Sequence, residues 1–121
     1  PNGQAQQAML RAALTDAAIS ADQCSSVEAH GTGTGLGDPI ETRSLASGIL
    51  QQRHSDRGLP LCSLKANVGH GEPCAGGSGL LNLTLGLCGA MSPPNTQLRL
   101  INPFVDTALK EYNCCLPSSA A

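Results

Sequence analysis

Aromatic side chains are nearly absent from this sequence: among 121 residues there is one Phe, one Tyr and no Trp. Because aromatic side chains bury the most area per residue, we expect a thin core of small and aliphatic residues. Charge is also sparse, at 13% of residues with a formal net charge of −2. The sequence lacks a basic stripe interleaved with aromatics and therefore predicts no nucleic-acid partner.

Long apolar runs are also missing, since none approaches the roughly 20 residues of a membrane helix. We therefore expect no membrane span. The first ten residues, PNGQAQQAML, have no initial Met and no charged segment followed by an apolar one. This pattern argues against a signal peptide and favours a piece of a longer chain. We expect a cytoplasmic protein, with an organelle as the alternative because any targeting segment would lie upstream of Pro1.

The cysteines lack the spacing of a metal site, because no two form a C-x-x-C pair. We therefore predict no structural zinc. In the absence of a secretory signal, we expect the thiols to be small buried hydrophobes in a reducing compartment rather than disulfides. The cysteines are Cys24, Cys62, Cys74, Cys88, Cys114 and Cys115.

Hydrophobic periodicity predicts helices alternating with strands. Asp38 and Pro39 are expected to start the second helix, as its cap and first residue. The third helix is rich in glycine and apolar on nearly every side, which predicts burial all round, against polypeptide outside this sequence. The helices are expected over residues 4–19, 39–50 and 74–91, and the strands over 26–30, 61–69 and 98–101.

The glycine-rich segment VEAHGTGTGLGDPIE, residues 27–41, does not match a phosphate-binding loop. The dinucleotide pattern G-x-G-x-x-G fails in both registers, because Leu36 and Asp38 stand where its third glycine belongs. The P-loop pattern fails because no glycine precedes a lysine. An acid at the start of the following helix would also repel a phosphate. We therefore expect the loop to bind something other than a phosphate.

His30 and His70 each end a predicted strand and each has a glycine neighbour. Sites in α/β proteins form at the carboxyl ends of strands. The residues alone leave a shared site and two structural histidines equally open. Nucleophile motifs fit less well: GGSGL has Leu80 where the serine elbow needs glycine, and Cys74 activated by His70 is a weaker alternative to a packing thiol.

Four blocks of the sequence resemble the β-ketoacyl synthase, or ketosynthase, domain of modular type I polyketide synthases. The resemblance implies the C-terminal portion of an α/β, thiolase-like fold with layered α/β/α/β/α architecture. It also implies a decarboxylative Claisen condensation of a malonyl-type thioester with an enzyme-bound acyl thioester, in polyketide or fatty acid biosynthesis. The blocks, in the family's order over residues 1–103, are PNGQAQQAMLRAAL, VEAHGTGTGLGDPIE, SLKANVGHGEPCAGGSGLL and PPNTQL…NP.

The same resemblance gives three residues catalytic roles. It implies that His30 and His70 polarise the carbonyl of the malonyl thioester, and that Lys65 is the active-site lysine of the family. Loss of carbon dioxide places negative charge on an enolate oxygen. Two imidazole N–H donors aimed at that oxygen would act like an oxyanion hole.

The resemblance also assigns the glycine loop to the phosphopantetheine arm of an acyl carrier protein. Thr32 and Thr34 would bond to the amides of the arm, and in an extended backbone both side chains point the same way. Gly31 and Gly33 would let the arm lie against the backbone because they carry no Cβ. No cofactor is expected to bind directly, and the arm is the substrate's carrier.

Two elements of the family are absent from this sequence: the nucleophile motif of the D-T-A-C-S type and the final G-x-x-x-T-N-A-H loop. We therefore expect residues 1–121 to be a partial domain that is inactive alone. In the intact domain the resemblance implies acyl carrier protein and acyl and malonyl thioesters as partners, and a homodimer. The alternatives are a catalytically inactive carrier-arm binding or dimerisation module and, less favoured, a small hydrolase that uses Cys74 and His70.

Overall fold

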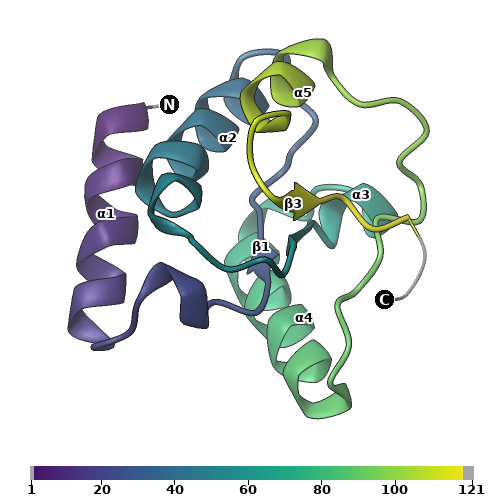
Figure 1. Cartoon of the computed structure of the whole chain (residues 1–121). Coiled ribbons are helices and arrows are strands. Elements are labelled where there is room, and N and C mark those ends of the chain that lie inside the picture. The colour runs from purple at the N-terminus through teal and green to yellow at the C-terminus, as the bar shows by residue number, and fades with distance from the viewer. Residues whose placement is uncertain (1, 119–121) are drawn as a thin grey trace.

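The centre of the computed structural model, which describes residues 2–118, is a parallel sheet of three short strands (Figure 1). Val27 pairs with Leu61 on one side of the central strand, and Leu59 pairs with Cys114 on the other. The order in the sheet is β1-β2-β3. The strands are β1 (Val27–Glu28), β2 (Leu59–Cys62) and β3 (Cys114–Cys115).

Helices surround this sheet, with α1 lying along α2 at one side and α4 running away from the strands (Figure 1). None of the helices in the described part of the chain is long and apolar enough to cross a membrane. Short 3₁₀ turns occupy Ala21–Gln23, Leu50–Gln52 and Glu72–Cys74. The α-helices are α1 (Gly3–Asp16), α2 (Gly37–Gly48), α3 (Lys65–Val68), α4 (Ala75–Gly89) and α5 (Pro103–Leu109).

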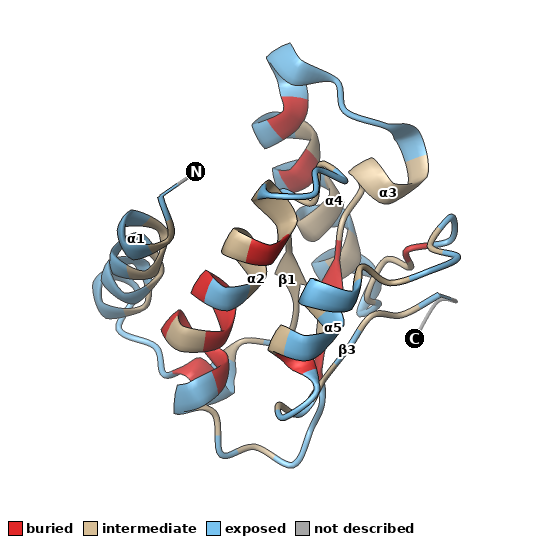
Figure 2. Cartoon of the chain, turned by 90° about the horizontal axis from the view of Figure 1, so that it is seen from above, coloured by how far each residue is buried: buried red, intermediate tan, exposed pale blue. Residues whose placement is uncertain are grey.

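The buried core lies between α2 and the sheet (Figure 2). As the composition predicts, no aromatic residue is among the buried core residues in the described chain, and the single Tyr packs against the core from its edge. Leu59 in β2 is fully buried. The core residues are Ala21, Leu45, Ala46, Ile49, Leu50, Leu59, Leu61 and Leu109.

Helix α1 packs on α2 through a close approach at Gly48. A Cβ at this glycine would lie 3.2 Å from Leu10 Cδ1, so a larger residue would require Leu10 to shift. The expected helix continued to Ile19, but α1 ends at Asp16. Ala18 adopts a left-handed backbone (φ 53°), and the N–H of Ile19 turns back to the carbonyl of Leu14. A helix commonly ends in this way.

Helix α2 begins differently from the expectation, because Asp38 is not its cap. The helix starts at Gly37, and the hydroxyl of Thr34 accepts a hydrogen bond from the Gly37 N–H at 3.1 Å. Thr34 therefore satisfies one of the free N–H groups of the first turn. Asp38 lies in that turn, where its charge favours the helix dipole.

Of the predicted strand over residues 61–69, only Leu61 and Cys62 lie in a strand, and the rest is wrong. Strand β2 ends at Cys62, and the chain turns at Leu64 (φ −55°, ψ −33°) into α3. The N–H of Leu64 donates to Glu28 in β1, and the side-chain amide of Asn67 donates to the carbonyl of Pro94. These contacts come from distant segments, so the local pattern of residues does not reveal them.

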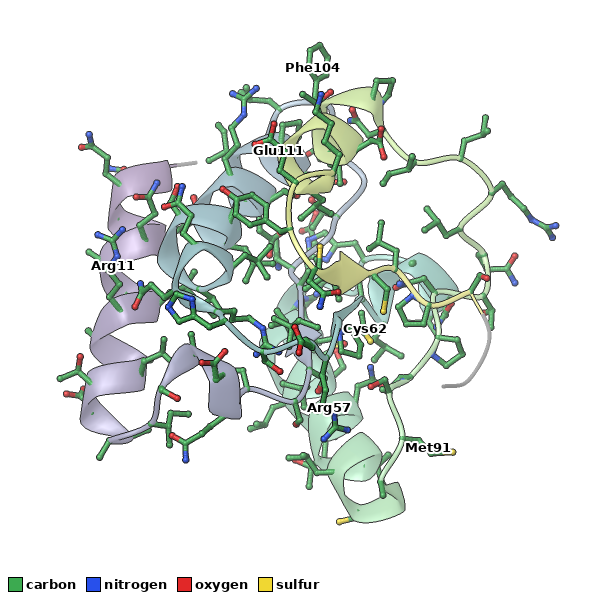
Figure 3. The ribbon with its side chains drawn as sticks, in the orientation of Figure 1. Arg11, Arg57, Cys62, Met91, Phe104 and Glu111 are labelled. Carbon is green, nitrogen blue, oxygen red and sulfur yellow. The ribbon has the colours of Figure 1, made fainter. Side chains whose placement is uncertain are left out.

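Helix α4 is nearly where the sequence predicts it, but it is not buried all round. It ends at Gly89, where Ala90 adopts a left-handed backbone (φ 51°). Ala75 and Gly79 are its buried residues. Met91, just beyond the helix, points outward (Figure 3). The helix's exposed leucines are Leu80, Leu81, Leu85 and Leu87.

The predicted strand over residues 98–101 is also wrong, because this segment carries no regular structure. The chain instead forms α5, which the sequence analysis missed although Asn102 and Pro103 are a strong helix start. The Asn102 side chain accepts a hydrogen bond from the N–H of Phe104 at 2.9 Å. Strand β3 was missed because it has only two residues, too few for a periodic pattern.

Asp22 fixes the loop that leads from α2 to β2, and we predict that this contact weakens in acid. Hydrogen bonds from the backbone N–H groups of His54 and Ser55 lower the pKa of Asp22 from 3.8. Because the folded pKa lies below the unfolded one, the stabilisation is present above about pH 4 and is lost as the pH falls through the folded pKa.

The measurement is the urea midpoint of the wild type against Asp22→Ala from pH 7 to pH 3. We expect the variant to be less stable at pH 7 and the gap to close in acid. Asp56→Ala, at an exposed carboxylate of the same loop, is the matched control and should show no such trend. A gap that is constant with pH would contradict the assignment.

Candidate active site

His30 and His70 lie together in the folded chain, as the resemblance implies. Their ring centroids are 5.4 Å apart and the rings are nearly perpendicular, at 86°, so one ring meets the other edge-on. Both residues are exposed. His30 follows β1, whereas His70 follows α3 and not the end of a strand as expected. Gly69 makes this possible by ending α3 with a positive φ of 81°.

Glu41 in α2 holds the backbone at His30. Its two carboxylate oxygens accept hydrogen bonds from the N–H groups of His30 (2.5 Å) and Gly31 (2.9 Å). From the sequence alone we expected Glu41 to be a structural acid in the first turn of the helix, where its charge is favourable to the helix dipole. A signal was available, because Glu41 lies one turn into the helix that follows the loop, and its carboxylate can reach back to the loop's N–H groups.

The glycine loop brings its threonines together. Thr32 Oγ1 and Thr34 Oγ1 are 3.5 Å apart, which agrees with side chains that point the same way. Gly31 and Gly33 have positive φ angles of 47° and 77°, a conformation that favours glycine. Ser63 crowds Gly31, because its Oγ would lie 2.6 Å from a Cβ at that position.

Lys65 lies in the first turn of α3 and not in a strand as expected. Asn67 anchors the same helix to the segment before α5, since it donates to the carbonyl of Pro94 and accepts from the hydroxyl of Thr96, both at 2.7 Å. Buried Asn95 binds the end of β2: it accepts from the Ser63 N–H at 2.8 Å and donates to the Leu61 carbonyl at 3.0 Å. From the sequence, Asn95 and Thr96 stood only within the block PPNTQL…NP, and Asn67 only within the block SLKANVGHGEPCAGGSGLL and the predicted strand over residues 61–69.

An open, largely apolar cavity of about 1130 Å³ adjoins His30 of the histidine pair. His30, Thr32 and Lys65 line it, together with aliphatic side chains of α2, α5 and the sheet. Phe104 is also in its lining, although the ring points outward from α5 and is mostly exposed (Figure 3). The cavity thus joins two of the three expected catalytic residues to one threonine of the loop.

Half of the cysteines are more exposed than expected. Cys62 is buried and Cys24 and Cys114 are partly buried, but Cys74, Cys88 and Cys115 are exposed, so Cys74 is not the packing thiol that we expected. All are free thiols. The Cys74 Sγ donates to the carbonyl of Gly71 at 3.4 Å. In the described residues, no group of three or more His, Cys, Asp or Glu side chains could hold a metal ion.

Comparison with known families identifies the class of domain to which this fold belongs. The family model described as the C-terminal domain of β-ketoacyl synthase matches residues 1–99. The chain therefore belongs to the β-ketoacyl synthase family, as its C-terminal part.

Named relatives are polyketide synthase proteins. The spectinabilin polyketide synthase system protein NorB of Streptomyces orinoci is 44% identical over 106 residues, which are 88% of this chain and 5% of that protein. A phenolphthiocerol/phthiocerol polyketide synthase protein of Mycobacterium tuberculosis is 42% identical over 113 residues, or 91% of this chain and 6% of that protein. The chain thus spans about a twentieth of these relatives.

Solved ketosynthase domains have the same fold. The oxazolomycin ketosynthase domain OzmH KS7 of Streptomyces albus superposes with a TM-score of 0.89 and 30% identity, over 100% of this chain and 21% of that chain. Ketosynthase twelve of the bacillaene polyketide synthase of Bacillus amyloliquefaciens gives a TM-score of 0.86 and 25% identity over 99% of this chain and 21% of that one. The expected thiolase-like fold is therefore confirmed, and this chain forms one part of it.

We predict that Gly31→Ala destabilises the chain by about 1–3 kcal/mol, the usual cost of a residue held in a sparsely populated conformation. Gly31 has positive φ and no room for a Cβ beside Ser63. Gly35→Ala is the matched control in the same loop, because a Cβ there has no neighbour within 4 Å. Urea unfolding measures both variants, and equal midpoints would contradict the loop geometry.

The thiols should also differ in reactivity. Burial raises the pKa of Cys62 to about 11, and the nearby charges of Glu28 and Cys115 add to this effect. At pH 8 only roughly a thousandth of such a thiol is thiolate, so iodoacetamide should label Cys74, Cys88 and Cys115 long before Cys62. Peptide mass spectrometry against time measures the order. In urea the difference should vanish, and Cys62 labelled as fast as Cys88 in the folded chain would disprove it.

Proposed function

We propose that this chain supplies the two-histidine half of a ketosynthase active site, which performs decarboxylative condensation of a malonyl-type thioester in polyketide biosynthesis. The observation that carries the proposal is the edge-on contact of His30 and His70 at 5.4 Å beside the glycine loop. The polyketide synthase relatives support the reaction class.

The reaction proposed for the pair begins with the malonyl thioester. The bond between its α-carbon and its carboxylate breaks, carbon dioxide leaves, and the electron pair moves toward the thioester oxygen as an enolate. An N–H donor from each imidazole stabilises the charge on that oxygen. The α-carbon then attacks an acyl thioester, whose carbonyl carbon gains the new bond while the thiolate leaves.

The glycine loop is proposed to receive the phosphopantetheine arm. Thr32 and Thr34 present their hydroxyls 3.5 Å apart, so both could bond to amides of one extended chain. Thr34 already accepts from the Gly37 N–H, which leaves its hydroxyl proton free to donate to a carbonyl of the arm. The arm's partner is an acyl carrier protein, and the intact domain is proposed to be a homodimer.

The acyl chain is proposed to be held by a cysteine on another segment of the ketosynthase domain. None of this chain's cysteines stands in a motif of the D-T-A-C-S type. Lys65 lies in the cavity lining beside the same loop, and its positive charge is proposed to favour the enolate. A cytoplasmic location is inferred from the bacterial polyketide synthase relatives.

The test is His70→Ala in a ketosynthase domain that contains this segment. We expect decarboxylation of the malonyl thioester to fall by ~10²–10³, the usual cost of one lost oxyanion donor, while acyl loading is unchanged. His54→Ala, at an exposed histidine in the loop before β2, is the matched control. Decarboxylation at the wild-type rate in His70→Ala would remove the proposed role.

A further inference from the structure

Glu28 in β1 connects three elements through one side chain. Its Oε1 accepts a hydrogen bond from the backbone N–H of Leu64 at 2.6 Å, and its Oε2 accepts one from the side-chain amide of Asn82 at 2.9 Å. Leu64 is the residue before α3, and Asn82 lies in α4. All three side chains are half-buried, so water competes less for these bonds than at an exposed site.

These contacts connect the two segments that carry the histidines. His30 is two residues after Glu28, just beyond β1. Leu64 directly precedes α3, and His70 lies two residues after that helix ends. Backbone pairing holds β1 to β2 only up to the bond from the Ala29 N–H to the Cys62 carbonyl. Beyond Cys62 the chain leaves the sheet. The hydroxyl of Ser63 then donates to the Gly31 carbonyl at 3.4 Å, and the Glu28 carboxylate makes the shorter contact, to the Leu64 N–H.

Helix α4 is shaped to accept the glutamate. Gly79 is buried, and a Cβ there would lie 3.3 Å from Glu28 Cγ. Gly79 and Asn82 are three residues apart and therefore share one face of the helix. Gly79 lets the helix approach the methylene groups of Glu28, and the side-chain amide of Asn82 donates to its carboxylate.

We propose that Glu28 is a positioning residue, which sets the distance between His30 and His70 by fixing the start of α3 to β1 and α4. Its role in catalysis rests on the proposed function of the histidine pair. Glu41 acts on the His30 side alone, because both of its contacts lie within the turn that follows β1. Glu28 instead acts between the two sides.

The experiment measures the nuclear Overhauser effect between the ring protons of His30 and His70 in the 121-residue chain, without substrate. Glu28→Ala removes both acceptor oxygens and should weaken this signal several-fold. Glu28→Gln keeps an oxygen for the Leu64 N–H, and its NH₂ group can donate to the Asn82 side-chain oxygen once the Asn82 amide turns over. It should therefore restore the signal.

Asp22→Ala is the matched control, because it also removes a carboxylate that accepts two backbone hydrogen bonds. Its donors are the N–H groups of His54 and Ser55, in the loop between α2 and β2, which carries neither His30 nor His70. It should leave the signal at the wild-type level. An unchanged signal in Glu28→Ala would overturn the proposal, and so would an equal loss in Asp22→Ala, which would mark the effect as general destabilisation.

If circular dichroism shows Glu28→Ala to be unfolded, Glu28→Asp takes its place. Its carboxylate is one methylene shorter and cannot reach both partners, so a weakened signal supports the proposal and an unchanged one overturns it. Because no substrate is present, this result is independent of the decarboxylation test. Suppose that the Glu28 variants change the histidine signal as expected while His70→Ala leaves decarboxylation unchanged. That pair of results would count against the proposed function and not against the positioning role of Glu28.

Discussion

The backbone N–H groups of residues just beyond the short strands need hydrogen-bond acceptors, and side-chain oxygens provide them. Strands β1 and β2 span only two and four residues, so the sheet satisfies few of the groups at their carboxyl ends. Glu41 accepts from His30 and Gly31, Asn95 from Ser63, and Glu28 from Leu64. An unsatisfied buried N–H costs about 1–3 kcal/mol, so these acceptors fix the path of the chain through the site.

The sequence predicts the elements that depend on local patterns but not the turns that depend on these acceptors. The strand before His30, the helix after the glycine loop and the glycine-rich helix α4 each follow from a local pattern of apolar residues, and the structure contains all three. The turn from β2 into α3 does not follow from such a pattern. It depends on Glu28, which is 36 residues from Leu64 in the chain, and on the carbonyl of Pro94, which is 27 residues from Asn67.

The candidate site divides in the same way. His30 and His70 were singled out as candidates by their places at the ends of predicted strands. Lys65 and the two threonines were singled out only by blocks that resemble a known family. Glu41, Glu28 and Asn95 were missed because their importance lies in what they accept or donate in three dimensions. An acid near a strand end is ordinarily a solvated residue, so composition gives no reason to prefer these acids over Glu111, which is exposed (Figure 3).

The solvent exposure of the histidines bears on how they can act. In water, with a dielectric constant near 80, a donor stabilises an enolate weakly, because the interaction of two charges falls as the dielectric constant rises. The imidazoles therefore need cover when the substrate is bound. The proposed pantetheine arm would supply part of it by lying along Gly31 and Thr32, which line the same cavity as His30 and a set of aliphatic side chains. Fixing the two rings in advance then matters more than exposing them, because donors already in place need no reorganisation as the charge develops.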